Sequence, residues 1–249
     1  MLRDRSCAAV KVFKLDEIGF SHDDVKRECD ILQNLKHKNI VQYIGHFYDG
    51  PNQKVYLKME LVNDGTLADH IKRKSLSLLI NKTLLADIAN GLEYIHGQRI
   101  LHRDMKPENV LLQKKSEVLR AKIADFNLSV QLTSSAVSQK SSRVGTSYYF
   151  SPEKAAGLKY DESADLWAVG CMVLEMTLQI RLTGPLWYDH AEINQKRESL
   201  IQETEQRCTL LGKLAKNLLC LDAKQRISAT QLKFGLTEVI CPSVYMLYD

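Results

Sequence analysis

One eight-residue run, His102-Arg-Asp-Met-Lys-Pro-Glu-Asn109, carries the strongest chemical signal in the sequence. Within it, the Asp104 carboxylate can orient a hydroxyl group and accept its proton, and the Asn109 amide oxygen can hold magnesium on a phosphate group. These two groups stand just before the apolar run Val110-Leu-Leu112, and together they suit phosphoryl transfer to a hydroxyl. The alternative is an ordinary polar loop, which the length of the pattern disfavours.

The run resembles the catalytic loop of eukaryotic-type Ser/Thr protein kinases. The resemblance implies that Asp104 is the catalytic carboxylate and that Asn109 is a metal ligand. Lys106 matches the Ser/Thr form of the loop and would steady the charge of the transferring phosphoryl group. ATP and Mg²⁺ are the implied cofactors.

A lysine and a glutamate near the start of the chain fit the same chemistry. Lys11 lies on a short β-type run, and Glu28 lies in a segment with helical spacing. A cation must hold the α and β phosphates, and a carboxylate must hold that cation in place. Taken alone, such residues are usually solvated surface charges. Together with the catalytic loop, they resemble the strand lysine and helix glutamate of the kinases.

The resemblance also implies an adenine site. The run Met59-Glu-Leu-Val62 resembles the hinge, with Met59 as gatekeeper and the backbone of Glu60 and Val62 bonded to adenine. Ala9 and Leu111 would enclose the base from its two sides. An edge strand that ends in a turn is also compatible with this run.

The run Asp125-Phe-Asn127 resembles the magnesium loop, with Asp125 as a metal ligand. The family has glycine at the position of Asn127. Glycine permits backbone torsions that cost other residues free energy, although asparagine tolerates the left-handed region better than most. We therefore read Asn127 as a brake on conformational change, with a neutral substitution as an equal alternative.

The run Gly145–Glu153 resembles the end of a kinase activation segment. The resemblance implies that Thr146 bonds the catalytic carboxylate and that Glu153 pairs with Arg226 to fasten the segment to the helical part of the chain. Asp165 resembles the buried aspartate that supports the catalytic-loop backbone. The amino-acid sequences of this run and of residues 39–45 are most similar to those of the NIMA-related and related Ser/Thr kinases.

Arg103, which precedes the catalytic aspartate, implies control by phosphorylation. A phosphate on Ser141 or Ser142, added by an upstream kinase, would give Arg103 a charge-assisted partner. Plain solvated linker serines are the even alternative. Glu108 hints at basic residues before the acceptor, or is a solvated charge at a helix edge.

The sequence departs from the kinase pattern at its start. Only Met1 to Arg5 precede the lysine strand, so the Gly-rich loop that covers the phosphates in the family is missing from this sequence. We expect weaker nucleotide binding and an exposed sheet edge. Two alternatives to an active enzyme stay open: a pseudokinase that serves as a binding scaffold, and a coding sequence that continues upstream.

Hydrophobic periodicity supplies the elements that must position these residues. It predicts strands over 7–13, 40–45, 54–62 and 120–124 and helices over 22–35, 67–73, 84–95 and 162–176. A Ser/Thr-rich loop over 133–147 and a solvated helix within 183–205 are also expected. The predicted fold is an α+β two-lobed kinase domain over 1–249, with a truncated β-lobe over 1–62 and a mainly helical lobe over 63–249.

Composition excludes several other classes of protein. The formal charge of +4 is spread along the chain, so nucleic acid is not an expected partner. Its six cysteines lack CxxC spacing, which favours reduced, buried thiols. No apolar run is long enough for a membrane span. We expect a cytoplasmic or nuclear protein that acts on protein substrates, with the oligomeric state left open.

Overall fold

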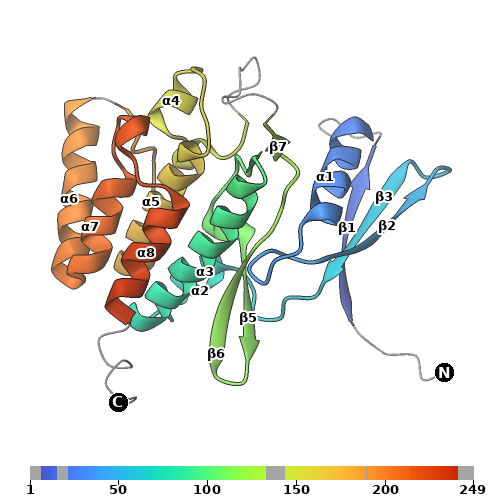
Figure 1. The fold of residues 1–249 in the computed structure, drawn as a ribbon, viewed down its shortest axis with the longest axis horizontal. Helices are drawn as coiled ribbons and strands as arrows, with labels where there is room; N and C mark the ends of the chain where they lie inside the picture. The colour runs from blue at the N-terminus through green and yellow to red at the C-terminus, as the bar shows by residue number, and fades with distance from the viewer. Residues whose placement is uncertain (1–6, 16–21, 133–143, 189, 241–249) are drawn as a thin grey trace.

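The small lobe consists of one sheet and one helix. In the computed structural model, which describes residues 7–15, 22–132, 144–188 and 190–240, three antiparallel strands run in the order β1-β3-β2. They are β1 (Ala8–Lys14), β2 (Tyr43–Asp49) and β3 (Lys54–Glu60), and α1 (His22–Asn34) packs beside them (Figure 1). The apolar stripe predicted for the helix is buried, because Val25, Cys29, Leu32 and Leu35 belong to the same core as Phe13 and Leu57.

The predicted strand over 40–45 is wrong in its position. Strand β2 begins at Tyr43, and Gly45 lies inside it, next to a shift in register. The apolar residues before it pair elsewhere: Val41 donates its backbone N–H to the carbonyl of Ile123 at 2.9 Å, and Ile40 forms an isolated bridge with Ile123. Ile40 and Val41 are each 1% exposed. The apolar run that suggested a strand is therefore buried at the junction of the two lobes.

A short linker joins the lobes. Strand β3 stops at Glu60, and α2 (Leu67–Lys72) begins after a capping box made by Thr66 and Asp69. The linker is tied to β5 (Val110–Lys115) by two backbone hydrogen bonds of 2.9 Å that join Asp64 and Gly65 to Leu112. This connection holds the hinge region against the strand that follows the catalytic loop.

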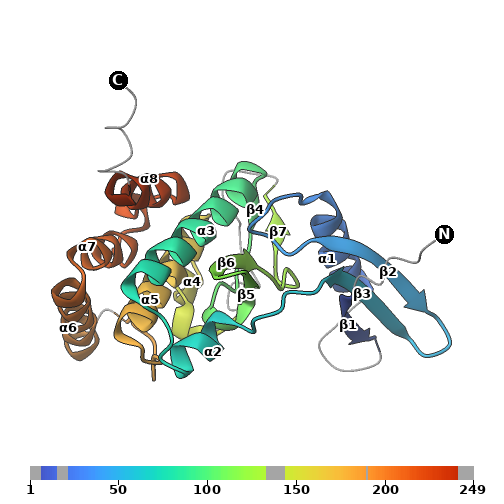
Figure 2. The same ribbon diagram turned by 90° about the horizontal axis from the view of Figure 1, so that it is seen from below.

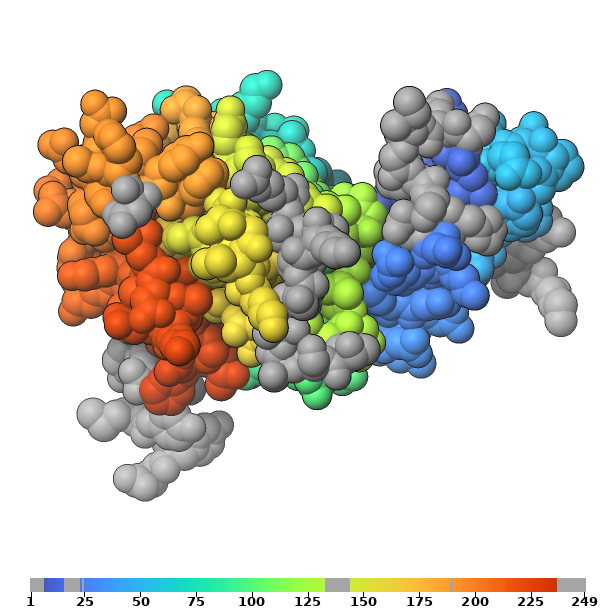
Figure 3. All heavy atoms as spheres, turned by 90° about the horizontal axis from the view of Figure 1, so that it is seen from above, coloured from blue at the N-terminus to red at the C-terminus, as the bar shows by residue number. Residues whose placement is uncertain are grey.

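The large lobe is mainly helical. Its further elements are α3 (Leu78–Gly97), β4 (Ile100–Leu101), β6 (Val118–Ile123), β7 (Val130–Gln131), α4 (Pro152–Ala155), α5 (Ser163–Leu178), α6 (Ala191–Arg207), α7 (Thr209–Leu218) and α8 (Ala229–Ile240). Helix α5 runs through the centre of this lobe, between α3 and the α6–α7 pair (Figure 2), and nearly all of its residues are buried. The small lobe, in blue, lies against the green surface around β5 to β7 (Figure 3). None of the helices in the described part of the chain has both the length and the apolar character of a membrane span.

Two other expectations hold in part. The solvated helix expected within 183–205 is α6, which starts at Ala191 and is exposed along most of its length, although it buries Arg197, whose Nη1 donates to the carbonyl of Leu186 at 3.0 Å. Cys29 and Cys171 are buried free thiols as predicted, but Cys7 is exposed. Cys208 and Cys220 are partly exposed, and Cys241 lies outside the described residues.

Candidate active site

The two lobes meet at a lysine between two carboxylates. Lys11 Nζ on β1 lies 3.0 Å from Glu28 Oε1 on α1 and 2.6 Å from Asp125 Oδ1, which follows β6. The predicted contact between the strand lysine and the helix glutamate is confirmed. Burial raises the pKa of Glu28, and the charge and hydrogen bond of Lys11 oppose that effect. The lysine therefore holds a buried carboxylate in place, and Glu28 in turn fixes the lysine.

A second cluster surrounds the Asp104 carboxylate. Asn109 Nδ2 donates to Asp104 Oδ2 at 3.0 Å, and Lys106 Nζ lies 2.7 Å from the same oxygen. On the other side, the Thr146 backbone N–H donates to Asp104 Oδ1 at 2.9 Å, and its hydroxyl lies 3.2 Å from that oxygen. The hydroxyl also accepts from Lys106 Nζ at 2.8 Å. The structure thus brings the predicted residues Lys106, Asn109 and Thr146 onto one carboxylate.

Gly145 allows the close approach of this segment. Its φ is +103°, and a Cβ atom there would lie 2.9 Å from the Arg103 carbonyl oxygen and 3.0 Å from Asp104 Oδ1. Only glycine adopts such a conformation at little cost and leaves room for the carboxylate. The backbone geometry therefore requires glycine at the position before Thr146.

The catalytic-loop backbone is held by Asp165 of α5, as predicted. Its two carboxylate oxygens accept the backbone N–H groups of His102 at 3.0 Å and Arg103 at 2.9 Å, and His96 Nε2 lies 3.1 Å away. Burial alone would raise the pKa of Asp165, but the hydrogen bonds and charge from His96 and His102 outweigh it and bring the pKa to about 2. This carboxylate stabilises the left-handed backbone of Arg103, whose φ is 69°.

His102 links the catalytic loop to the metal loop, a role that sequence reasoning missed. Its Nε2 lies 2.9 Å from the carbonyl oxygen of Ala124, and its ring meets the Phe126 ring edge-on at 5.0 Å between centroids. The Ala124 backbone N–H also donates to the Asn109 carbonyl at 2.9 Å. The histidine and the backbone bond place Asp125 beside Asn109.

The torsion argument for Asn127 is wrong for this conformation. The residue of the metal loop with positive φ is Asp125, at 64°, and Asn127 is not among the non-glycine residues with positive φ. Its position therefore has no backbone strain of the kind that glycine relieves. Its Oδ1 atom is nevertheless buried and has no hydrogen-bond partner among the described residues.

The hinge residues lie between the lobes. Met59 pairs with Ala9 in the register of β1 and β3, and the Glu60 backbone N–H donates to the Gln42 carbonyl at 2.9 Å. That bond leaves the Glu60 carbonyl, rather than its N–H, as the group for adenine. Val62 and Leu111 are partly exposed hydrophobic residues packed against the core. The contacts of all these hinge residues with adenine stay predictions.

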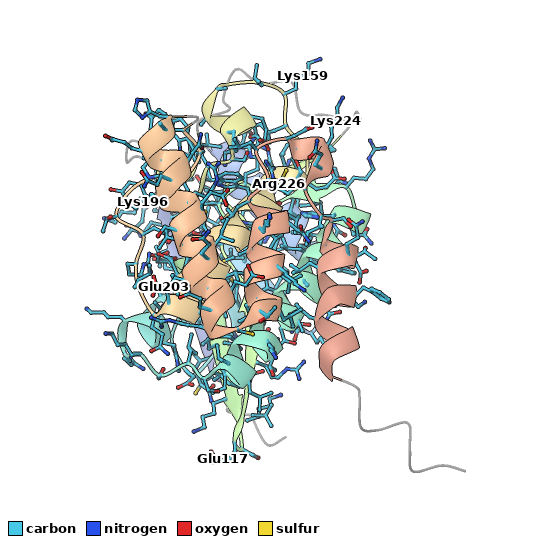
Figure 4. The ribbon with its side chains drawn as sticks, turned by 90° about the vertical axis from the view of Figure 1, so that its left-hand side faces the viewer. Glu117, Lys159, Lys196, Glu203, Lys224 and Arg226 are labelled. Carbon is cyan, nitrogen blue, oxygen red and sulfur yellow. The ribbon has the colours of Figure 1, made fainter. Side chains whose placement is uncertain are left out.

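The activation segment is anchored as predicted at its end. The guanidinium of Arg226 donates to the two oxygens of Glu153 at 2.8 and 3.2 Å, and it also bonds the carbonyls of Ser163 and Cys220. In Figure 4, Arg226 lies within the lobe, whereas Lys224 points away from it. Ser151 accepts from the Lys154 backbone N–H and caps α4.

The regulatory prediction is only partly covered by the structure. Ser141 and Ser142 lie outside the described residues. Arg103 donates from Nε to the carbonyl of Leu128, so its side chain already lies along the start of the segment. Pairing of Arg103 with a phosphate stays a prediction.

Two cations near the site were missed by sequence reasoning. Lys154 is buried below the catalytic loop, where its Nζ donates to the Arg103 carbonyl and lies 4.5 Å from the centre of the Phe150 ring. Burial lowers the pKa of Lys154 to about 8. Arg181 contacts Glu108 beside the catalytic loop. Neither cation belongs to a recognisable motif, so no sequence signal could have found them.

The donors near Asp125 suit a hard cation. The described residues contain no cluster of three or more His, Cys, Asp or Glu side chains that could hold a metal. Magnesium, however, is commonly bound by one or two protein groups together with substrate phosphates. The Asp125 carboxylate is 33% exposed, and the Asn109 amide oxygen has no hydrogen-bond donor in the described part of the chain. These two oxygen donors fit such a site.

Comparison with known proteins defines the class. The family described as "Protein kinase domain" matches residues 2–234, and the chain belongs to the protein kinase family. Serine/threonine-protein kinases are among its relatives, in agreement with the resemblance in the catalytic loop.

The relatives come from several kinase groups. The chain is 35% identical over 232 residues to myosin light chain kinase A of Dictyostelium discoideum, covering 89% of this chain and 76% of that protein. It is 32% identical to an Aurora kinase of Candida glabrata, covering 91% of this chain and 62% of the relative. It is 38% identical to serine/threonine-protein kinase Nek8 of Danio rerio, covering 61% of this chain and 21% of that protein.

A solved structure shares the fold. A chain in the crystal structure of the yeast RNA Pol II CTD kinase CTDK-1 complex matches with a TM-score of 0.72 and 23% sequence identity, covering 91% of this chain and 83% of that one. The likeness confirms the predicted two-lobed α+β kinase fold.

Proposed function

We propose that this chain transfers the γ-phosphoryl group of ATP to serine or threonine hydroxyls of protein substrates. The observation that supports this most directly is the Asp104 carboxylate, which Lys106, Asn109 and Thr146 bond at 2.7 to 3.2 Å. These bonds fix the carboxylate without closing it off, because Asp104 keeps 7% of its side chain exposed beside the partly exposed Lys106. A hydroxyl that reaches Asp104 can be oriented and can lose its proton there.

The charged groups divide the remaining work. Lys11, which Glu28 holds, would bind the α and β phosphates, and Lys106 would place positive charge beside the group in transfer. The Lys106 ammonium lies between the Asp104 carboxylate and the Thr146 hydroxyl, so it is already next to the acceptor position. Both lysines act by charge and position, the two effects on which phosphoryl transfer most depends.

We assign the metal to Asp125 and Asn109. These two residues would hold magnesium, which would supply positive charge to stabilise the phosphates during transfer. The protein's part is to present two oxygen donors on loops that the His102 and Ala124 contacts hold together. Asp125 bonds Lys11 in this structure, so the same carboxylate serves both the lysine and the proposed metal.

Ala9, Met59, Val62, Leu111 and the Glu60 carbonyl are the groups we propose for adenine. The finer predictions on context also stay proposals: magnesium as the metal, an upstream kinase that acts on Ser141 or Ser142, and an intracellular location. The chain covers 62% and 21% of two of the relatives compared above, so the substrates of those proteins are not carried over.

The decisive experiment measures phosphate transfer from γ-labelled ATP to a generic basic protein. Asp104→Asn removes the proposed base and should lower the rate by about 100-fold or more. Asp30→Asn, an exposed aspartate of α1, is the matched control and should leave the rate unchanged. Equal transfer by the wild-type and Asp104→Asn chains would defeat the catalytic proposal and favour a scaffold that keeps the kinase fold.

A further inference from the structure

One arginine joins three distant segments beside the proposed acceptor site. Arg181, which follows the end of α5, donates from Nη2 to Glu108 Oε1 at 2.6 Å and to the Tyr149 hydroxyl at 3.0 Å. Its Nε lies 3.2 Å from Glu175 Oε1. The guanidinium thus bridges the turn that follows Lys106, the buried face of α5 and the segment that follows Thr146.

The two carboxylates in this cluster differ in exposure. Glu175 is fully buried, whereas 46% of the Glu108 side chain is exposed. Burial raises the pKa of Glu175, an effect that the Leu182 backbone N–H at 2.7 Å and Arg181 oppose. Without the arginine, Glu175 would take up a proton more readily, because burial penalises its charged form. Glu108 is the carboxylate of the pair that faces solvent.

Two members of this cluster are close in sequence to residues that bond the two oxygens of the Asp104 carboxylate. Glu108 precedes Asn109, which bonds one Asp104 oxygen, in the 3-10 turn Pro107–Asn109. Tyr149 ends the turn that follows Thr146, which bonds the other oxygen. A substrate polypeptide that brings a hydroxyl to Asp104 therefore passes close to the cluster. Charged residues of the substrate then interact with the charges of Arg181 and Glu108.

We propose that Arg181 is a specificity-determining residue that is held by the buried Glu175 and occupies the exposed Glu108 carboxylate. The inference rests on the proposed kinase function. Among the described residues, no other cation pairs with Glu108. With Arg181 in place, a basic substrate residue must compete with the Arg181 guanidinium for Glu108, so the chain accepts substrates without a requirement for arginine. Glu108 is an exposed charge, as one of the two sequence-based readings has it, but its pairing with Arg181 means that it is not a free site for basic residues.

The test compares the wild-type chain, Arg181→Gln and the double variant Arg181→Gln/Glu108→Gln. Each is assayed with serine peptides that differ only by Arg or Ala at one of four positions on either side of the serine. For the wild-type chain, kcat/KM with Arg should stay within about 2-fold of kcat/KM with Ala at every position. Arg181→Gln should raise this ratio about 10-fold at one position or more, because a charge-assisted hydrogen bond becomes available. The double variant should return the ratio to the wild-type value.

Several results would overturn the proposal. They are a wild-type chain that already prefers Arg about 10-fold, an Arg181→Gln chain with an unchanged ratio, and a gained preference that survives Glu108→Gln. If Arg181→Gln fails to fold, the proposal is tested by the wild-type ratio of kcat/KM with Arg to kcat/KM with Ala and by the single variant Glu108→Gln. That variant leaves Arg181 paired with Glu175, so the ratio of kcat/KM with Arg to kcat/KM with Ala should stay within about 2-fold of the wild-type value. A larger fall would show that Glu108 already binds substrate arginine in the wild-type chain and would overturn the proposal. Wild-type transfer no greater than that of Asp104→Asn would defeat the kinase function itself, whereas normal transfer without these ratio changes defeats only the role of Arg181.

Discussion

The ammonium group of Lys11 lies 2.6 Å from the carboxylate of Asp125, although 114 residues separate the two in the sequence. The bond joins the sheet of the small lobe to the loop that follows β6. Glu28 holds the same ammonium from α1 at 3.0 Å. The lysine is therefore already placed at the boundary of the two lobes, between the carboxylate that orients it and the carboxylate that we assign to the metal.

Lys11→Met should lower kcat/KM for ATP by about 100-fold, because the cation proposed for the phosphates is lost. Initial rates at varied ATP concentration give this value. Lys58→Met, which removes an exposed lysine from β3, is the matched control. An equal loss in the two variants would show that the effect arises from net charge and not from the position of Lys11.

Asn127→Gly should leave kcat within about 2-fold of the wild-type value. The left-handed torsion of the metal loop lies on Asp125, at a φ of 64°, so glycine at position 127 relieves no strain in this conformation. Turnover measured at saturating ATP tests this. A rise of 10-fold or more would restore the hypothesis that Asn127 restrains a conformational change.

Contacts that chemistry demands were predictable from the sequence. The Lys11–Glu28 pair could be inferred because a phosphate-binding cation needs a carboxylate that holds it. The Glu153–Arg226 pair and the support of the catalytic loop by Asp165 followed from the resemblance alone. In each case, residue types at a known spacing implied one partner.

Contacts that tertiary packing decides were not predictable. Arg181 takes its partners from three segments, and nothing in the local sequence names them. Lys154 would ordinarily be read as a solvated helix charge, but its ammonium is buried under the Arg103 carbonyl. The start of β2 was misplaced because the apolar pair Ile40 and Val41 satisfies strand and junction equally well, and periodicity does not separate the two.

Arg226→Ala should lower the free energy of unfolding by about 3 kcal/mol, because it leaves Glu153 and several carbonyl oxygens without their donor. The Arg226 side chain is fully buried, so solvent cannot replace the lost contacts. Urea denaturation monitored by circular dichroism measures the change. Lys224→Ala is the control, since Lys224 is exposed two residues away and should change stability by less than about 0.5 kcal/mol. Similar losses in both variants would contradict the anchoring role of Arg226.

Lys154 should make stability depend on pH in the alkaline range. Burial lowers its pKa from an ordinary 10.5 to about 8, an effect that Arg103 reinforces and that Asp165, Asp104 and Glu153 oppose. Between these two values the unfolded chain keeps a proton that the folded chain has lost. The charged form therefore destabilises the folded state below pH 8, and this cost is relieved as the pH rises.

The free energy of unfolding of the wild-type chain should thus rise by about 1 kcal/mol relative to Lys154→Met between pH 7 and pH 9. Urea denaturation of both chains at each pH gives the difference, in which the titrations of tyrosines and cysteines cancel. Lys159→Met is the matched control, because Lys159 is exposed and points away from the lobe (Figure 4). Its difference from the wild-type chain should stay constant over the same range. A constant difference for Lys154→Met as well would mean that the Lys154 ammonium keeps its proton in the folded chain, and that its bond to the Arg103 carbonyl is stronger than the burial penalty.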